Sequence, residues 1–479
     1  MANELVALVK HDCPVCDRLL PALDAAGVRV VSQSSRDETA AQADRLGLAH
    51  VPELDDDLAL SARLDLDAVP ALVLFEDGER EADRVEGLQR ARIAELAQRA
   101  GTALDLDGLP EWLPGCASRT RDPEVAAALA ARAARRDGRL RAREIDIGEL
   151  EDIHEALLAR GVSDGLPVVP PTPERVVRML EGTSRDPQDL VAVLPPYDGE
   201  ATVEKVAINA VMAGCAPEHL PVVLAAVRAA AKPEFALHGL VATTHPAGPA
   251  IVAFGTDVGI NAAGNCLGQG TRANLVIGRG LQLTVRNVGG GRPQVEDRAA
   301  HGQPGKVGLC FAEREEGNPW PPPFERPTVM LMALEAPRIV VDQLAREPEG
   351  LAASLALALE SVAHPKQRLA WDALLVVGPE HARVFGEAGW SREHLQQRLF
   401  ELTMSPAGEL VRGAGGTPEG IEARFVSDPE MPVAKFAAPD RIKIVHAGGD
   451  AGLFSMVFGS WAAGEIGSAP VTEEVEAWA

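Results

Sequence analysis

The feature that most constrains the fold is a pair of cysteines, Cys13 and Cys16, at a junction between a strand pattern and a helix pattern. Residues 5–9 form a short apolar run, and apolar residues at helical spacing follow over 19–26. A thiol in the first turn of a helix lies near unpaired backbone N–H groups, which favour the thiolate. Pro14 suits this turn because it lacks an N–H that would have no partner there. We therefore expect Cys13 to act as a nucleophile and Cys16 to resolve the mixed disulfide.

The alternative interpretation of this pair is half of a zinc site. A structural zinc site needs two more ligands at comparable spacing, and the sequence has no second cysteine pair. The four other cysteines stand far apart in the sequence, and six in total are too few for a disulfide scaffold of 479 residues. These isolated cysteines are Cys116, Cys215, Cys266 and Cys310. The pattern favours a redox pair, and we expect no metal site.

The first hundred residues alternate strand and helix patterns, as a compact α/β layer does. Strands are predicted over residues 5–9, 28–31, 71–75 and 82–87, and helices over 19–26, 38–46 and 90–99. The fourth strand is expected at the edge of the sheet.

Residues 1–100 resemble the thioredoxin/glutaredoxin superfamily. The resemblance rests on the strand–Cys-Pro-Val-Cys–helix start, on Ala68-Val69-Pro70 entering a strand, and on the hairpin Phe75-Glu76-Asp77-Gly78. It implies a thioredoxin-like fold, thiol–disulfide exchange without a cofactor, and a cis Pro70 that faces the redox cysteines. The chain departs from the family in a longer interval between Cys16 and Pro70, which contains an acidic stretch over 52–57.

The chain is predicted to have three parts: a redox domain over residues 1–102, a linker with a helical segment over 103–149, and a larger α/β domain over 150–479. Within the third part, predicted helices cover residues 173–180, 203–213, 220–231 and 351–362. Its predicted strands cover residues 240–244, 250–254, 328–332, 338–341, 373–377 and 443–445.

Cys215 is a candidate second nucleophile. It follows Gly214 at the end of an apolar helix pattern and precedes a new helix that begins near Glu218 and His219. A thiol at a helix start beside an imidazole is an activated arrangement. The alternative is a buried cysteine between two packed helices, which behaves as a small apolar residue.

A glycine-rich stretch over 255–291 is a candidate ligand loop. Exposed backbone N–H groups and nearby guanidinium groups can hold a carboxylate or a phosphate, whereas glycines in tight structural turns are the competing interpretation. The candidate residues are Asn265, Cys266, Gly268, Arg272, Asn274 and Arg279. Glu313 is a further candidate, as a general base or a cation ligand, and a solvated acidic turn is its alternative.

The chain holds 46 Lys and Arg against 70 Asp and Glu, a net charge of −24. Nucleic acids and anionic membranes both attract basic surfaces, so this charge argues against both as partners. The first residues contain no basic segment followed by an apolar run, so we expect a cytoplasmic protein.

The leading hypothesis is a thiol–disulfide oxidoreductase module fused to an α/β domain that binds or transforms a small substrate, with Cys215 or Cys266 as internal relay thiol. Its expected partners are a small-molecule or protein disulfide, a cellular dithiol reductant and a second copy of the chain. The second hypothesis is a cysteine-dependent lyase or transferase centred on Cys215. The third is a non-enzymatic, redox-controlled assembly module. The larger domain resembles a group of uncharacterised bacterial proteins. The sequence leaves open whether this domain uses a cofactor.

Overall fold

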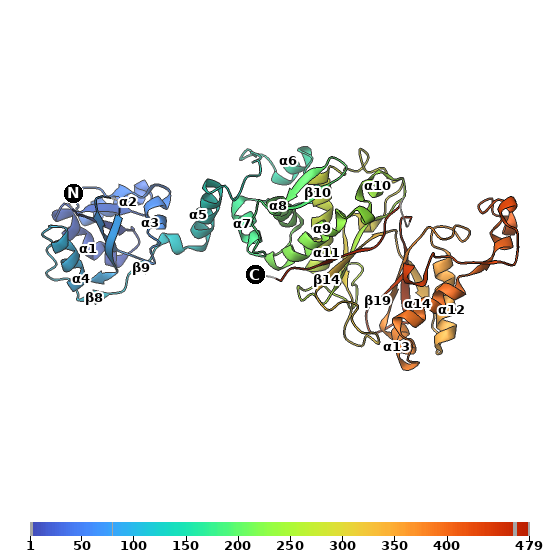
Figure 1. Cartoon of the computed structure of the whole chain (residues 1–479). Helices are drawn as coiled ribbons and strands as arrows, with labels where there is room; N and C mark the ends of the chain where they lie inside the picture. The colour runs from blue at the N-terminus through green and yellow to red at the C-terminus, as the bar shows by residue number, and fades with distance from the viewer. Residues whose placement is uncertain (1–2, 79, 463–466, 478–479) are drawn as a thin grey trace. The chain divides into compact units, whose positions relative to one another are not determined.

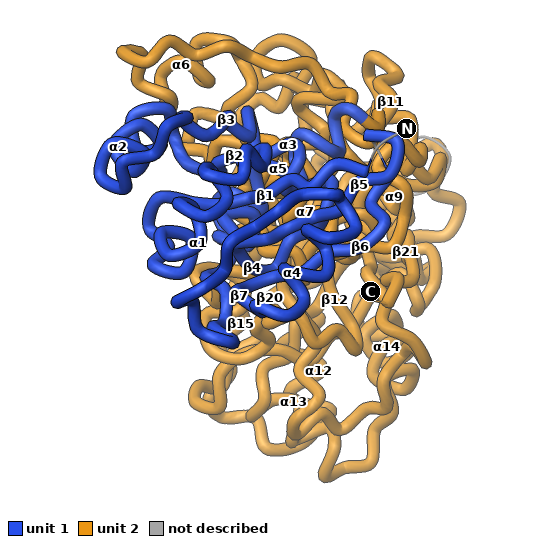
Figure 2. Tube along the Cα trace, turned by 90° about the vertical axis from the view of Figure 1, so that its left-hand side faces the viewer, with its two compact units in different colours: residues 1–136 blue, residues 137–479 orange. Residues whose placement is uncertain are grey.

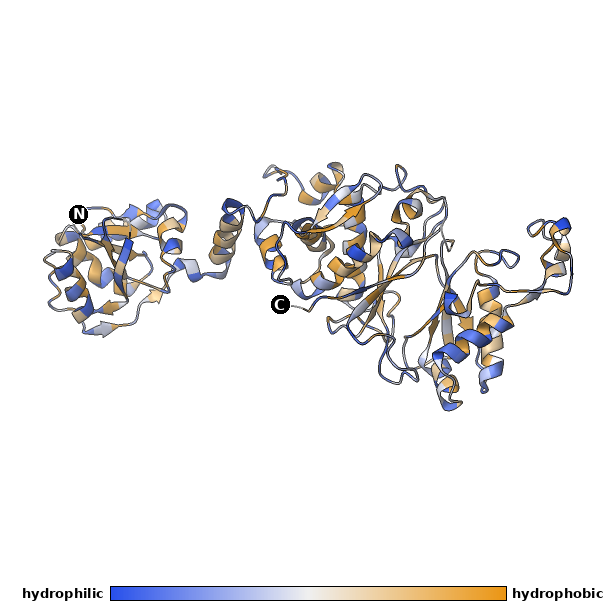
Figure 3. Ribbon diagram, in the orientation of Figure 1, coloured by the Kyte–Doolittle hydropathy of each residue, from blue (hydrophilic) through white to orange (hydrophobic). Residues whose placement is uncertain are grey.

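The computed structural model describes residues 3–78, 80–462 and 467–477, and over these residues the chain forms two compact units. Unit 1 comprises residues 1–136 and unit 2 residues 137–479 (Figure 2). Helix α5 (Pro123–Arg136), within the segment predicted as a linker, is grouped with unit 1. In each unit the apolar residues gather along the strands and on the inner faces of the helices (Figure 3).

Unit 1 is built on a mixed sheet (Figure 1). Within its described residues the sheet has five strands in the order β3-β2-β1-β5-β6, with β1, β2 and β3 parallel and β5 and β6 antiparallel to their neighbours. Its strands are β1 (Glu4–Val9), β2 (Arg29–Ser32), β3 (Glu53–Leu54), β5 (Ala71–Glu76) and β6 (Arg80–Glu86). As predicted, the last of these strands lies at the sheet edge, and β3 lies inside the acidic stretch over 52–57.

Alternating residues of β1 pack into two cores, one on each face of the sheet, because successive side chains of a strand point to opposite faces. Val6 and Leu8 pack in the core that contains Cys13 and Cys16, and Leu5 packs in the other core. The helices of unit 1, besides α5, are α1 (Pro14–Ala25), α2 (Arg36–Leu46), α3 (Ala59–Arg63) and α4 (Arg90–Arg99).

Two short antiparallel ladders join unit 1's sheet region to the segment that follows α4. β7 (Leu88–Gln89) pairs with β8 (Trp112–Leu113), and β4 (Ala68–Val69) pairs with β9 (Cys116–Ala117). The segment predicted as the start of a linker is therefore folded onto unit 1.

Unit 2 contains two mixed sheets, each of four strands in the described part of the chain. The first has the order β13-β12-β14-β21, from β12 (Gly248–Phe254), β13 (Leu309–Ala312), β14 (Thr328–Leu334) and β21 (Val471–Glu474). The second has the order β15-β20-β16-β19, from β15 (Arg338–Val341), β16 (Ala373–Val377), β19 (Ile442–His446) and β20 (Phe454–Gly459). Short ladders pair β10 (Leu190–Leu194) with β11 (Gly199–Thr202) and β17 (Ser405–Pro406) with β18 (Pro432–Val433).

The two sheets of unit 2 pack face to face, and helices cover their outer faces (Figure 1). Buried residues of both sheets, including Val252, Met332, Leu374 and Phe458, share one apolar core. On the first sheet lie α9 (Leu220–Ala230) and α11 (Arg272–Thr284), and α8 (Val203–Ala213) packs against these two helices. The helices α6 (Ile153–Ala159), α7 (Pro173–Leu180) and α10 (Leu237–Ala242) lie in the same part of the unit (Figure 1). The second sheet packs against α12 (Pro348–Glu360), α13 (Pro379–Glu387) and α14 (Arg392–Leu402).

The two sheets repeat one strand pattern and exchange their last strands. In each, two parallel strands joined through helices are followed by an antiparallel strand: β12, β13 and β14 in the first, and β16, β19 and β20 in the second. The next strand then crosses over, so that β15 pairs with β20 and β21 pairs with β14. The chain crosses at Leu334 and Ser460, which form an antiparallel bridge. This exchange ties the two halves of unit 2 into one body.

The strand predicted over residues 240–244 is wrong, because the chain forms helix α10 there. Leu237, Leu240 and Val241 are buried at helical spacing. Thr243 and Thr244, two of the β-branched residues in this range, lie beyond the end of the helix. Tertiary packing has overridden local β-propensity here.

Lys435 supplies a stability test for unit 2. Its side chain is fully buried, and Nζ donates hydrogen bonds to the carbonyl oxygens of Val362, His364 and Gln367 at 2.8, 2.9 and 2.9 Å. Lys435→Met keeps the side-chain length but leaves these acceptors without their donor. Because a buried unsatisfied acceptor costs about 1–3 kcal/mol, we expect the free energy of unfolding of unit 2 to fall by about 3 kcal/mol.

Urea unfolding followed by tryptophan fluorescence measures this change, since Trp320, Trp371 and Trp390 lie in unit 2. Lys443→Met is the control, because Lys443 is partly exposed. We expect it to cost less than about 1 kcal/mol. Equal losses in the two variants would contradict the role given to Lys435.

Candidate active site

Cys13 caps the N-terminus of α1. Its backbone is extended, with φ −113° and ψ 105°, and Cys16 N donates to Cys13 Sγ at 3.2 Å. Pro14 occupies the first helical position, as the sequence predicts. The nucleophile candidate therefore receives a backbone N–H from the helix that it begins.

Pro70 lies on the other side of the same sulfur. The Val69–Pro70 peptide bond is cis, and Cys13 Sγ lies 3.5 Å from Val69 O. The chain thus brings the loop before β5 against the start of α1, although the residues are 56 positions apart. This is the placement that the family resemblance implies for Pro70.

Cys116 is a third cysteine at this site, and the sequence reasoning missed it. Its backbone lies opposite Val69 in the β4–β9 ladder, and Val69 O lies 3.5 Å from Cys13 Sγ. Cys116 packs, partly buried, against the core that holds Cys13 and Cys16. Sequence spacing concealed it, since no local pattern relates residue 116 to residue 13.

The surrounding hydrogen bonds make Cys13 the acidic thiol of the group. Donation from the Cys16 thiol, and then from the Cys116 thiol and the backbone N–H groups of Cys16 and Val15, lowers the pKa of Cys13 to about 5 despite its burial. Burial and the nearby Cys13 sulfur raise the pKa of Cys16 well above its usual range and that of Cys116 to about 11. At neutral pH the site therefore holds one thiolate and two thiols.

All six cysteines of the chain are free thiols in the structure, and Cys13 and Cys16 are fully buried, with 0% of each side chain exposed. Direct attack by Cys13 on an outside disulfide therefore requires part of unit 1 to move.

Cys215 is a buried thiol and lacks the activated arrangement beside an imidazole that the sequence suggests. It is buried in unit 2, where its thiol donates to Val276 O at 3.4 Å. His219 Nδ1 accepts from the backbone N–H of Ala216, so the imidazole caps its own turn. Burial raises the pKa of Cys215 to about 12. Glu218 directly precedes His219, which is buried. Cys215 therefore has the environment of an apolar core thiol.

The glycine-rich loop is tied together by its own polar groups. Asn274 is buried, and its Nδ2 donates to Asn261 O, Cys266 O and Cys310 O. Asn265 adopts φ 61°, and its carbonyl accepts from Gly268 N at 2.9 Å. Burial raises the pKa of Cys266 to about 11. These contacts are those of a tight structural turn.

Two arginines of this stretch, Arg272 and Arg279, bind groups of the chain itself. Arg272 donates to Gly214 O through Nε and Nη2, at 2.8 and 2.6 Å. Arg279 forms a bidentate ion pair with Asp164, with N–O distances of 2.8 and 2.7 Å. Both guanidinium groups thus fasten loops of unit 2, and their donors are engaged where an anion was expected to bind.

Glu313 is buried rather than solvated. Its Oε1 accepts from Arg392 Nη2 at 3.0 Å and from His446 N at 3.4 Å, and burial raises its pKa. The ring of His446 donates through Nδ1 to Arg314 O at 2.9 Å. This places Glu313 and His446 where β13 and β19 end, at the meeting of the two sheets.

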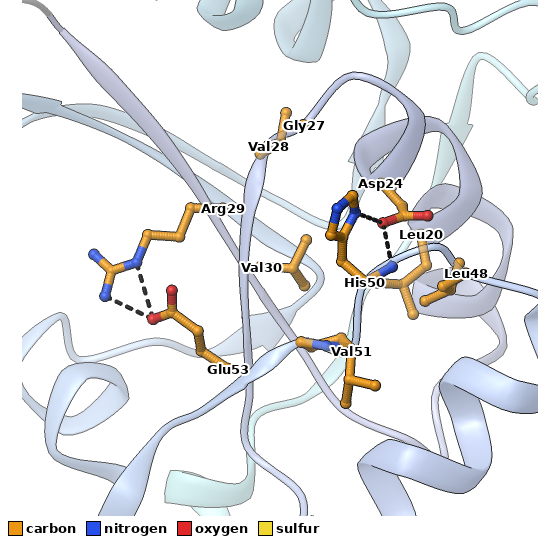
Figure 4. A pocket seen from close by; sticks show the side chains of 11 residues that line it. Leu20, Asp24, Gly27, Val28, Arg29, Val30, Leu48, His50, Val51 and Glu53 are labelled. Carbon is orange, nitrogen blue, oxygen red and sulfur yellow. Dashed lines mark hydrogen bonds and ion pairs between the residues drawn. The ribbon is translucent and has the colours of Figure 1, made fainter.

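Two hollows of the surface have no cysteine among their lining residues. One, in unit 1, is lined by residues that include Leu20 and Val30, with Asp24 bonded to His50 and Arg29 to Glu53 (Figure 4). Another, in unit 2, includes Phe254, Phe324, Glu313 and Arg326. Among the described residues, no group of three or more His, Cys, Asp and Glu side chains has a metal-binding arrangement. Over residues 3–78, 80–462 and 467–477, no helix is long and apolar enough to cross a membrane.

Comparison with solved structures finds StoA from Bacillus subtilis, with 14% sequence identity and a TM-score of 0.18, over 20% of this chain and 82% of that chain. It also finds a secreted Mycobacterium tuberculosis disulfide oxidoreductase, described as homologous to E. coli DsbE. That match has 18% identity and a TM-score of 0.18, over 21% of this chain and 81% of that chain. No family model and no curated protein matches the chain.

Proposed function

We propose that unit 1 is a thioredoxin-like thiol–disulfide oxidoreductase, in which Cys13 is the nucleophile and Cys16 the resolving thiol. The observation that carries this proposal is the environment of Cys13: a sulfur at a helix N-terminus that accepts a hydrogen bond from Cys16 N and, as a thiol, donates one to the carbonyl before a cis proline, at 3.5 Å. The mixed sheet β3-β2-β1-β5-β6, with α1 following β1, supports the thioredoxin-like assignment.

The exchange follows from the different acidities of the two thiols. The Cys13 thiolate attacks one sulfur of a substrate disulfide, forming a Cys13–substrate disulfide and releasing the other sulfur as a thiolate, which takes up a proton. Cys16 then loses its proton and attacks Cys13 Sγ, which releases the second substrate thiol and leaves a Cys13–Cys16 disulfide. A cellular dithiol reductant returns the pair to thiols by the reverse exchange. No cofactor takes part in these steps.

The pKa of Cys16 falls during this sequence. Burial is the first cause of its high value, but the hydrogen bond and the charge of the Cys13 thiolate add to it. Once Cys13 is in a mixed disulfide, those two contributions disappear. Cys16 thus stays protonated while Cys13 attacks and becomes easier to deprotonate when it must resolve the intermediate.

The buried state of Cys215 disfavours the alternative in which this cysteine is the nucleophile of a lyase or transferase. For unit 2 we keep the proposal that it binds a small substrate and exchanges electrons or thiols with unit 1.

Ionisation of Cys13 provides the first test. Its pKa is lowered to about 5 from a usual value of 9.0, so the thiolate should appear as pH rises through about 5 and stay fully formed at neutral pH. We expect the ultraviolet thiolate absorbance of the reduced protein to show this step and Cys13→Ser to lose it. A first step near pH 9 would contradict the site described above.

Activity provides the second test. With dithiothreitol as reductant, the protein should reduce insulin disulfides, and Cys13→Ser should lower the rate to the uncatalysed level, because no other cysteine of the chain has a lowered pKa. Cys215→Ala should retain the rate. The opposite result, in which Cys215→Ala is inactive and Cys13→Ser is active, would favour the lyase or transferase hypothesis for unit 2.

A further inference from the structure

The chain from residue 109 to residue 121, which we name the crossing segment, passes beside the cis-proline loop and is fastened at both ends. At its start, β8 pairs with β7, and Arg90 N donates to Glu111 O at 3.0 Å. At its end, Ser118 N donates to Asp67 O at 2.9 Å, and Thr120 Oγ1 donates to Leu66 O at 3.2 Å. Cys116 lies between these two attachments.

A buried glutamine adds a further attachment beside Cys116. Gln33 Nε2 donates to Ser118 Oγ at 2.8 Å and to Ser61 Oγ at 2.9 Å, and Gln33 Oε1 accepts from Arg119 N at 3.0 Å. The side chain of Gln33 is 3% exposed, so these bonds form away from water. The end of β2 is thereby joined directly to the residues that follow Cys116.

Gly115 allows the segment to approach the loop closely. A Cβ atom at this position would lie 2.8 Å from Ala68 Cβ and 2.9 Å from Val69 O. Both contacts are shorter than real Cβ atoms make. The residue before Cys116 is therefore restricted to glycine while β9 stays paired with β4.

This approach places Cys116 beside the part of the chain that contacts Cys13. Residues directly opposite in an antiparallel pair have Cα atoms about 4.5–5.5 Å apart. Cys116 is opposite Val69, whose carbonyl oxygen is 3.5 Å from Cys13 Sγ, and Cys116 packs against the core that contains Cys13. Cys116 thus lies beside the nucleophile candidate, and the crossing segment helps to bury Cys13.

We propose that Cys116 is a third redox cysteine, which attacks Cys13 to form a Cys13–Cys116 disulfide inside unit 1. The proposal rests on the proposed thiol–disulfide exchange at Cys13. Cys116 then competes with outside thiols for Cys13. The crossing segment must open before a large substrate reaches Cys13.

The exchange needs no further oxidant once Cys13 is in a disulfide. Cys116 loses its proton, its sulfur bonds to Cys13 Sγ, and the earlier bond of Cys13 breaks. The leaving sulfur, from Cys16 or from a substrate, departs as a thiolate and takes up a proton. One disulfide is lost and one is formed, so the oxidation state of the protein is unchanged.

The test uses the full chain with Cys16→Ser, treated with oxidised glutathione under native conditions. Cys13 should form a disulfide with glutathione, and Cys116 should then displace the glutathione. We expect non-reducing peptide mass spectrometry to find a Cys13–Cys116 link in most of the protein. With Cys116→Ser added, or Cys116→Ala as a second variant, glutathione should remain on Cys13.

The outcomes separate this inference from the proposed function. Stable glutathione on Cys13 in Cys16→Ser, as abundant as in the double variants, would overturn the role of Cys116 and leave the exchange at Cys13 intact. An absence of any disulfide on Cys13 in all three proteins would overturn the proposed function itself.

Opening of the crossing segment has a separate test. Gly115→Val forces β9 away from Val69, so Cys13 should react faster with an aromatic disulfide, by roughly tenfold, the change that about 1.4 kcal/mol of easier opening produces. Ala117→Val is the control, because Ala117 is exposed and its β-branched replacement fits the paired strand. Equal rates for Gly115→Val and the parent chain would contradict the covering role.

Discussion

The structure of unit 1 depends on keeping a charged sulfur inside the protein. Cys13 is fully buried, and burial alone would disfavour its thiolate. Hydrogen bonds from the thiols of Cys16 and Cys116 and from the first backbone N–H groups of α1 outweigh that cost. Two neighbouring elements hold Cys13 in place: β1 leads directly into the start of α1, and the loop that ends at Pro70 contacts the sulfur through Val69 O.

In the proposed exchange, the same interactions set the order in which the thiols react. A proton that is held on Cys16 or Cys116 stabilises the negative charge of Cys13, so only one of the three sulfurs is ionised at neutral pH. When Cys13 forms a disulfide, this coupling ends and the other two thiols become more acidic. The choice between Cys16 and Cys116 as the attacking thiol is then decided by position, because Cys16 is fixed in α1 whereas Cys116 lies on a segment that can open.

Local patterns predicted the strand–helix start with Cys13 at the head of the helix, because this is a short, strongly patterned segment, and the family resemblance implied the cis bond before Pro70. They did not reveal Cys116, which approaches Cys13 only through the β4–β9 ladder and was read as an isolated cysteine beside a linker. Long-range pairing was also the reason that the strand exchange in unit 2 escaped prediction: β15 and β21 each pair with the sheet of the other half.

Candidate residues in unit 2 show a related limit. Arg272, Arg279 and Asn274 have the chemistry of ligand-binding groups, and in the fold they bind backbone carbonyls and Asp164 instead. Sequence alone cannot distinguish an arginine that binds an anion from one that hydrogen-bonds a loop of its own chain, since both roles place a guanidinium donor in a polar turn. Glu313 was expected in a loop and is buried, because Arg392 reaches it from α14.

A redox titration of the full chain against glutathione buffers, read by alkylation and mass spectrometry, tests the central claim most directly. A Cys13 pKa of about 5 stabilises the reduced form, which makes the disulfide more oxidising. We predict a reversible two-electron transition at Cys13, with a midpoint between about −270 and −120 mV. Thiols that stay reduced at every glutathione ratio, or a transition that leaves Cys13 unchanged, would contradict the account.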